Sequence, residues 1–169
     1  MRRLIIFFMA IFCASQAYGS EIRYVDAGKL LSESRPAQAA RHHLGEARKV
    51  LEQGYEDLGK AWEKSKDKDR VLREGLEALN AQMRAEEQAA LGVVARIMKE
   101  EISAWRKANN VDLVIARQDL LDASEELDVT QAIMESMDRR EAAFAELPKV
   151  TVKEPEPAAP AKPAPKKRK

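Results

Sequence analysis

The protein has 169 residues, of which 29 are Lys or Arg and 28 are Asp or Glu, with only 5% aromatic residues and one Cys. This balance, rich in Ala, Glu, Lys, Arg and Leu, is typical of long helices and coiled coils and argues against a compact globular enzyme. Acidic residues modestly outnumber basic ones from residue 20 to 147, and the chain is basic from Pro148 onward. The near-neutral total therefore averages an acidic folded part and a basic tail.

The first residues have the pattern of a cleavable secretory signal peptide. Arg2 and Arg3 are followed by an apolar run over residues 4–12 and then by small and polar residues ending at Gly19. The run is too short to cross a bilayer as a helix, which takes about 20 residues. We expect a signal peptide over 1–19, with cleavage after Gly19 or, as a second choice, after Ala17.

Cys13 leaves one alternative, in which lipid is attached at this cysteine. Phe12, directly before it, is bulky and fits that reading poorly. If the signal peptide is removed, Cys13 is removed with it, and the exported chain has no thiol for disulfide or thiolate chemistry.

The exported chain is expected to begin with a strand over residues 22–25, which is β-branched and aromatic. The segment 26–28 interrupts it. Ser34 then offers a hydroxyl to the free amides of a helix start, and Pro36 fits the first turn, where no N–H is needed.

Two long apolar seams follow, each with the seven-residue repeat of a coiled coil. In the first seam Leu44, Leu51 and Leu58 recur every seven residues. In the second, heptad positions are taken by Leu76, Met83, Ala90 and Ile97, and Glu86 interrupts the seam. The segment 64–70 between them has no apolar residue, and Asp67 or Asp69 can cap the second helix.

Two seamed helices joined by a polar turn predict an antiparallel hairpin arm over 35–108, because a short connection makes neighbouring helices run in opposite directions. One continuous helix through the polar segment is the alternative. An ordinary compact bundle is harder to build, since two helices offer too little apolar surface to close a core.

Beyond the arm, Asn109 and Asn110 end the second helix, since both tolerate the left-handed conformation used at helix ends. Residues 111–115 are strongly strand-forming, and 120–123 are expected to return as another strand. Thr130 is expected to cap a short helix whose buried face includes Ile133 and Met137. From residue 148 to 169 the chain is rich in Pro, Ala and Lys, and we expect a disordered tail.

The order of these elements, and three local motifs, resemble the Skp/OmpH family. Residues 22–26 and 30–37 are similar to that family's first strand and the start of its arm. Residues 111–116 are similar to its second strand, and 127–130 to its closing Asp-aliphatic-Thr helix start. The likeness extends from residue 22 to about 138.

The resemblance implies an α+β, mostly helical chain: a small β-sheet body over 20–34 and 109–147, and a long antiparallel coiled-coil hairpin arm over 35–108. It also implies a homotrimer with a central barrel, and an ATP-independent periplasmic holdase chaperone for unfolded outer-membrane β-barrel proteins. The folded part of this chain is not strongly basic, unlike well-known members. An exported coiled-coil structural or interaction protein of the cell envelope is the alternative.

Physical reasoning leads to the same kind of assembly, because short strands in one chain are marginal as an independent sheet. We expect obligate oligomerisation through Ile22, Tyr24, Val111, Leu113 and Ile115. Client chains are expected to contact aromatic and sulfur-containing side chains of the arm, unless these pack between the two helices: Tyr55, Trp62, Met98 and Trp105.

Basic residues at the arm tip can meet a client or lipid phosphate, or can form a solvated turn: Lys64, Lys66, Lys68, Arg70 and Arg73. The basic tail can touch an anionic membrane surface, whereas specific nucleic-acid binding is not expected. The only histidines are His42 and His43. They are expected to be surface residues, because neighbours on a helix diverge too widely to clamp a metal. With no metal, cofactor or catalytic constellation, we expect no enzyme.

Overall fold

The computed structural model describes residues 21–154, so the expected signal peptide, Cys13 and the tail beyond Glu154 lie outside the described residues. Within this range the expectation of a mostly helical chain with long helices and a small sheet is confirmed. The elements, in chain order, are β1 (Ile22–Val25), α1 (Ala27–Glu33), α2 (Arg35–Ala61), α3 (Lys68–Ala108), β2 (Leu113–Ala116), η1 (Arg117–Asp119), η2 (Glu125–Leu127) and α4 (Thr130–Met137).

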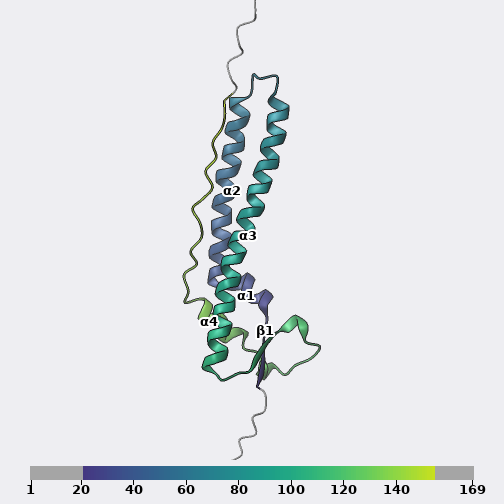
Figure 1. Ribbon diagram of the computed structural model, residues 1–169, viewed down its shortest axis with the longest axis vertical. Helices are drawn as coiled ribbons and strands as arrows, with labels where there is room; N and C mark the ends of the chain where they lie inside the picture. The colour runs from purple at the N-terminus through teal and green to yellow at the C-terminus, as the bar shows by residue number, and fades with distance from the viewer. Residues whose placement is uncertain (1–20, 155–169) are drawn as a thin grey trace, which may run out of the picture.

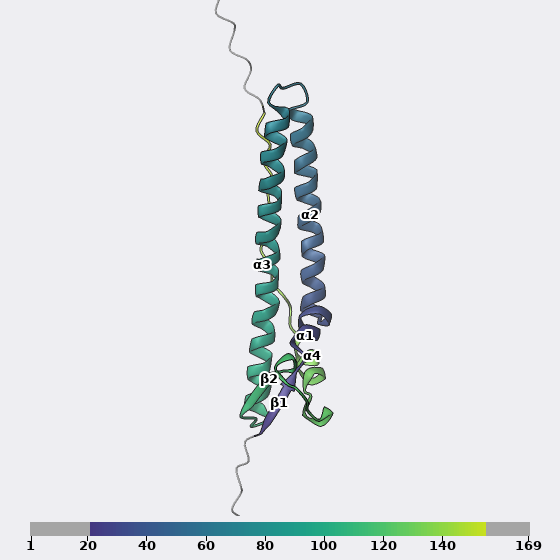
Figure 2. The same cartoon turned by 90° about the vertical axis from the view of Figure 1, so that its right-hand side faces the viewer.

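The helices α2 and α3 lie side by side as a long arm that projects from a small body, and residues 62–67 join them at the far end (Figures 1 and 2). Ser34 begins α2 as expected, since its hydroxyl accepts a hydrogen bond from the Ala37 amide at 3.4 Å. Asp67 directly precedes α3 at its N-cap position, but its side chain makes no capping hydrogen bond.

The sheet of the body contains two strands, β1 and β2, which pair in parallel with Ile22 opposite Leu113 and Val25 opposite Ala116. A parallel pair needs a long crossover between its strands, and here the whole arm supplies it. Val111 was expected inside the second strand. It lies instead buried in the turn between α3 and β2, directly after Asn110, whose positive φ of 53° turns the chain.

The expected returning strand at 120–123 is wrong. The segment between the short helical turns η1 and η2 loops away from the sheet, and Leu121 is fully exposed there. The chain meets β1 again only at Asp128, through a single isolated bridge to Tyr24. The loop leaves the sheet edge because its two 3₁₀ turns do not provide the extended backbone that a ladder requires.

The short helix α1 was not expected from the sequence. Asp26 begins it, and its carboxylate accepts a hydrogen bond from the Lys29 amide at 2.9 Å. Leu30 then points into the core and is fully buried. This helix turns the chain between β1 and the start of α2.

Thr130 was expected to cap α4, and that expectation is wrong. The carboxylate of Asp128 accepts the hydrogen bond from the Thr130 amide instead, at 2.8 Å. The Thr130 hydroxyl accepts a hydrogen bond from the Asp26 amide, also at 2.8 Å. Thr130 therefore joins the two distant ends of the domain, 104 residues apart in sequence.

The hydrophobic core lies where the body meets the base of the arm. It draws on β1, α1, the first turns of α2, the second half of α3 and α4. Its buried members are Val25, Leu30, Ala37, Ala40, Ala90, Val94, Ile97, Val129, Ile133, Met134 and Met137. The distal part of the arm contributes nothing to this cluster.

Polar contacts fix α4 and the residues after it against α3. Glu101, only 8% exposed, accepts hydrogen bonds from the Ser136 hydroxyl and from Arg140. Arg140 also pairs with Glu100 at 2.8 Å. Hydrogen bonds to Glu100 and Glu101 raise the pKa of Arg140, as expected for a cation held between two carboxylates.

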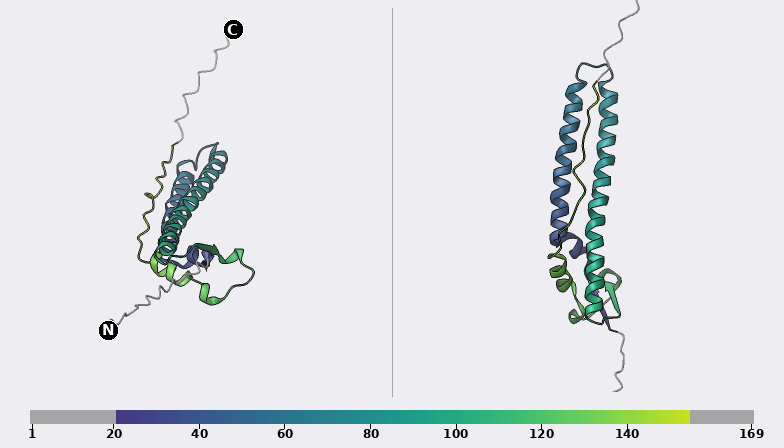
Figure 3. Two further views of the ribbon diagram at one scale, coloured as in Figure 1. Left: turned by 60° about the horizontal axis from the view of Figure 1, so that its bottom comes forward. Right: turned by 60° about the vertical axis from the view of Figure 1, so that its left-hand side comes forward.

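After α4 the chain turns back and follows the arm as an extended segment, here called the strap, residues 141–154 (Figures 1 and 3). Near the body, Phe144 packs against the core and stacks on His43, with ring centroids 5.0 Å apart. Residues 148–154, where the tail was expected to begin, have no regular secondary structure and lie along α2 and α3.

Candidate functional site

A groove lies between α2 and α3 in the distal arm, and the two helices together with residues 148–152 of the strap enclose a space of about 400 Å³ there. The helix α2 lines it with Leu51, Gly54, Tyr55 and Leu58. The helix α3 lines it with Gly75, Ala78, Leu79 and Gln82. Apart from Gln82 and the Tyr55 hydroxyl, this wall is apolar.

Two glycines shape the groove. A β-carbon on Gly75 would stand 2.6 Å from Leu58, so this glycine allows the two helices to approach. A β-carbon on Gly54 would stand 2.4 Å from a methyl group of Val150, which belongs to the strap. Because Gly54 has no side chain, Val150 of the strap can pack directly against the backbone of α2 at this position.

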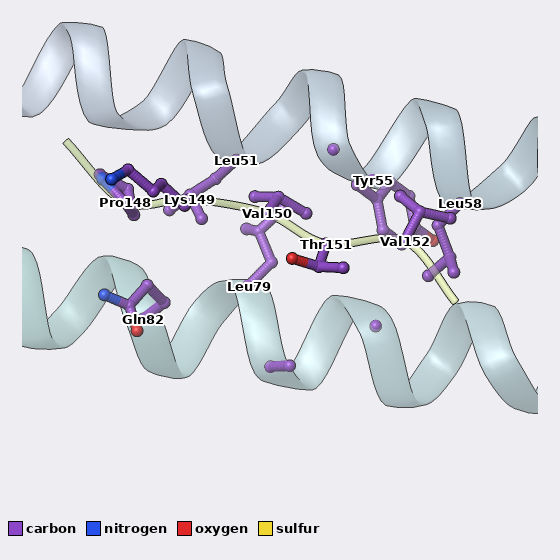
Figure 4. Close-up of a pocket in the computed structure, with 13 residues that line it drawn as sticks. Leu51, Tyr55, Leu58, Leu79, Gln82, Pro148, Lys149, Val150, Thr151 and Val152 are labelled. Carbon is purple, nitrogen blue, oxygen red and sulfur yellow. The ribbon is translucent and has the colours of Figure 1, made fainter. Parts of the chain in front are cut away.

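The strap runs along the groove between the two helices and forms one of its walls, with Val150 and Val152 among the lining side chains (Figure 4). At the far end, the indole N–H of Trp62 donates a hydrogen bond to the carbonyl oxygen of Lys153 at 2.7 Å. Among the described residues, this is the one hydrogen bond between the strap and the two helices. Side-chain contact thus holds most of the strap in place.

The four predicted client-binding residues fall into two separate groups. Tyr55 lines the groove, and Trp62 closes its far end through the hydrogen bond to the strap. Met98 and Trp105 lie at the base of the arm, partly buried against the core of the body. Within one chain, Tyr55 and Trp62 therefore lie at the groove and its far end, whereas Met98 and Trp105 lie near the body.

The residues of the predicted oligomer surface differ in exposure. Ile22 and Leu113 form one rung of the sheet and are 42% and 48% exposed. Tyr24 and Val111 are buried, and Ile115 is half-buried. In the single chain, the outer rung of the sheet therefore presents two large apolar side chains to its surroundings.

Charges along the arm are paired within each helix. At the tip, Arg70 bonds Glu74 at 3.0 Å and lies 3.5 Å from Asp67; the Glu74 hydrogen bond and charge raise the pKa of Arg70. Lys64 and Lys66 are exposed in the turn. Among residues 21–154, Arg70 is the one predicted tip residue with an ion pair, and contact of the tip with a client or lipid phosphate stays a prediction.

Lower on the arm, two carboxyl groups are held ionised by neighbouring lysines. A hydrogen bond from Lys49 lowers the pKa of Glu46, and a hydrogen bond from Lys60 lowers the pKa of Asp57. In each pair the lysine lies three residues after the acid, on the same face of α2.

His42 is exposed as expected, but the expectation of a surface position is wrong for His43. Its Nε2 lies 3.8 Å from a carboxylate oxygen of Glu86, and its ring stacks on Phe144. Glu86, the residue that interrupts the second seam, is 9% exposed and also accepts a hydrogen bond from Gln82. The seam defect is thus filled by a polar contact between α2 and α3.

Residues 21–154 contain no group of His, Cys, Asp and Glu side chains placed to hold a metal ion. In the same range, every helix is either too short or too polar to span a membrane.

Comparisons with known proteins give one distant likeness. No family model matches the chain, and no curated protein matches it. A crystal structure from Caulobacter crescentus CB15, described provisionally as an OmpH-like outer membrane chaperone, is similar over 76% of this chain and 89% of its own. The two share 17% sequence identity, with a TM-score of 0.43.

Proposed function

We propose that the protein is a non-enzymatic, ATP-independent holdase that binds unfolded outer-membrane β-barrel proteins in the periplasm. The observation that carries this proposal is the groove of the arm, which holds an extended stretch of polypeptide through apolar contacts and a single backbone-directed hydrogen bond. A holdase needs contacts of this kind, because they act on many sequences and leave the bound chain free to fold later.

The sheet of the body has features that favour association with other subunits, as the proposal requires. Its sheet has two strands of four residues each, too few for independent stability. Ile22 and Leu113 stand exposed on its outer rung. Pairing of these edges between three subunits would cover them and form a central barrel, from which three arms would project around a shared cavity.

The test is suppression of aggregation. A urea-unfolded β-barrel protein is diluted into buffer with the purified protein, and light scattering is recorded. We expect scattering to be suppressed at about one oligomer per client, and the mass of the oligomer to be that of a trimer by native mass spectrometry. Unchanged scattering would contradict the holdase proposal.

A shortened arm provides the matched control. Leu58 lies against Gly75 and His43 against Glu86, so equal lengths of α2 and α3 stand opposite each other. Removing residues 48–61 together with 69–82 keeps the turn and the base of the arm, including Ala90 and Val94 of the core. We expect this variant to assemble normally and to lose most of its holding activity.

The alternative, an exported coiled-coil structural or interaction protein of the cell envelope, is favoured by one observation. The groove is already covered by the chain's own strap, as in a self-contained three-segment arm. A protein of this kind would leave aggregation of the unfolded client unchanged in both the full-length and the shortened form.

A further inference from the structure

The strap is held against the two helices by few contacts, so another extended chain could displace it. Val150 remains 42% exposed although it sits over Gly54. Between the strap and the two helices the described residues make a single hydrogen bond, from Trp62 to the Lys153 carbonyl. A segment held mainly by two partly exposed valines and one hydrogen bond is weakly bound compared with a buried core element.

The contacts that hold the strap define what the groove accepts. Val150 and Val152 are alternate residues, and the side chains of alternate residues point the same way in an extended chain. The intervening Thr151 is polar; it is exposed and also lines the groove, where Val150 is 42% exposed and Val152 is half-buried. Trp62 recognises a main-chain carbonyl, a group that every residue carries. The groove therefore selects an extended backbone with β-branched apolar side chains at alternate positions, and it does not select one particular sequence.

This is the pattern of a transmembrane β-strand, in which apolar and polar residues alternate. We propose that the groove between α2 and α3 is a binding site for extended segments of this alternating pattern, and that residues 148–153 of the strap are its resident, competing occupant. The source of the incoming segments, unfolded β-barrel proteins, rests on the proposed function. The specificity of the groove rests on Gly54, Trp62 and the strap.

Competition in cis sets a threshold for client binding. A short tether holds its ligand at a local concentration in the millimolar range, so a single weak segment seldom displaces the strap. A long unfolded chain presents many such segments, and several arms of an oligomer can engage it together. The strap thereby favours long unfolded clients over short peptides or folded proteins.

The test uses full-length protein in a Trp105→Phe background, so that Trp62 is the one tryptophan that reports on the groove. The probe is a fluorescein-labelled peptide with the sequence of residues 146–154, and a scrambled peptide of the same composition is the control. In the double variant Val150→Ser, Val152→Ser we expect red-shifted Trp62 emission and peptide binding at least about tenfold tighter than in the parent, because the competing strap is released.

Glycine variants test whether the peptide binds at the position that Val150 takes up against Gly54. Adding Gly54→Ala to the double serine variant should abolish the tenfold gain in peptide affinity, because the new β-carbon takes the space in which a strap valine packs. Gly45→Ala is the matched control, since a β-carbon there meets nothing within 4 Å. Equal peptide affinity in parent and double serine variant, or a gain that survives Gly54→Ala, would overturn the proposal.

If the double serine variant is unfolded by circular dichroism, Val150→Thr gives the milder test, since threonine keeps the branched shape and weakens only the apolar contact. Aggregation assays on the same samples separate the two proposals. Peptide exchange without holding activity supports the groove and contradicts the holdase function. Holding activity without peptide exchange contradicts the groove and leaves the holdase function standing.

Discussion

The indole nitrogen of Trp62 donates a hydrogen bond to the carbonyl oxygen of Lys153 at 2.7 Å, across 91 positions of sequence. This bond fastens the far end of the strap to the tip of the arm, while Phe144 fastens its near end against His43. Between these two points the strap depends on the fit of Val150 over Gly54. The arm is therefore a structure of three segments, two helical and one extended.

Replacing Trp62 with Phe should loosen the strap without disturbing the helices. The aromatic ring remains, but the hydrogen bond to Lys153 is lost, at a net cost of about 0.5–1.5 kcal/mol. We expect trypsin to cut faster after Lys149 and Lys153, as followed by mass spectrometry. The control is Trp105→Phe, which alters a residue packed at the body, and an equal increase in cleavage there would contradict the assigned role of Trp62.

Thr130 should be sensitive to loss of its hydroxyl rather than of its methyl group. Thr130→Val leaves the Asp26 amide without its partner in a site where Thr130 is 5% exposed, which costs about 1–3 kcal/mol. Thr130→Ser keeps the hydroxyl and should cost less. Denaturant unfolding of both variants measures the difference, and equal losses would show that the methyl group, not the hydrogen bond, holds the two ends of the domain together.

Core packing of α4 should decide the stability of the body. Ile133 is fully buried among residues from α1, α2 and α3, so Ile133→Ala is expected to lower the free energy of unfolding by about 2–5 kcal/mol. Gln131→Ala, at an exposed position of the same helix, should change it by no more than about 0.5 kcal/mol. Similar effects of the two substitutions would contradict the placement of the core.

Several elements could be predicted from the sequence because their causes are local. Ser34 with Pro36, the apolar-free turn near residue 65 and the Asn109–Asn110 helix end each carry their signal within a few residues. The cap of α4 could not be assigned in this way, because the Thr130 hydroxyl bonds the Asp26 amide across 104 positions. The expected strand at 120–123 failed for a related reason: strand propensity does not reveal whether a partner edge is within reach.

The sequence predicted some of the residues at the groove but not the glycines that make room for it. Tyr55 and Trp62 were singled out for their size, whereas Gly54 and Gly75, which create the space, were not. The available signal was the presence of five glycines inside the two heptad helices, where each glycine costs about 0.5–1 kcal/mol relative to alanine, but the sequence does not tell these two from the other three. The valines at 150 and 152 stood out in a Pro- and Lys-rich segment, but their partners on α2 and α3 are set by the return of the chain along the arm.

Acid should weaken the arm slightly. The pKa values of Glu46 and Asp57 are lowered from ordinary values of 4.5 and 3.8 by hydrogen bonds from lysines. Because the folded pKa lies below the unfolded one, the stabilisation is complete above the unfolded pKa and is lost as the pH falls through the folded pKa. We expect arm helicity to fall less steeply below about pH 4.5 in Glu46→Gln, Asp57→Asn than in the parent; an equally steep fall would contradict these pairs.

The central claim, that unfolded chains bind in the groove of the arm, is tested most directly by site-specific photo-crosslinking. A photoreactive residue is placed at Ala78, which lines the groove, or at exposed Asn80, two positions along α3 and on its other side. With a urea-unfolded β-barrel protein, the groove account predicts strong crosslinks from position 78 that increase when the strap is released by Val150→Ser, and weak ones from position 80. Equal crosslinking from both positions, or none from 78, would contradict it.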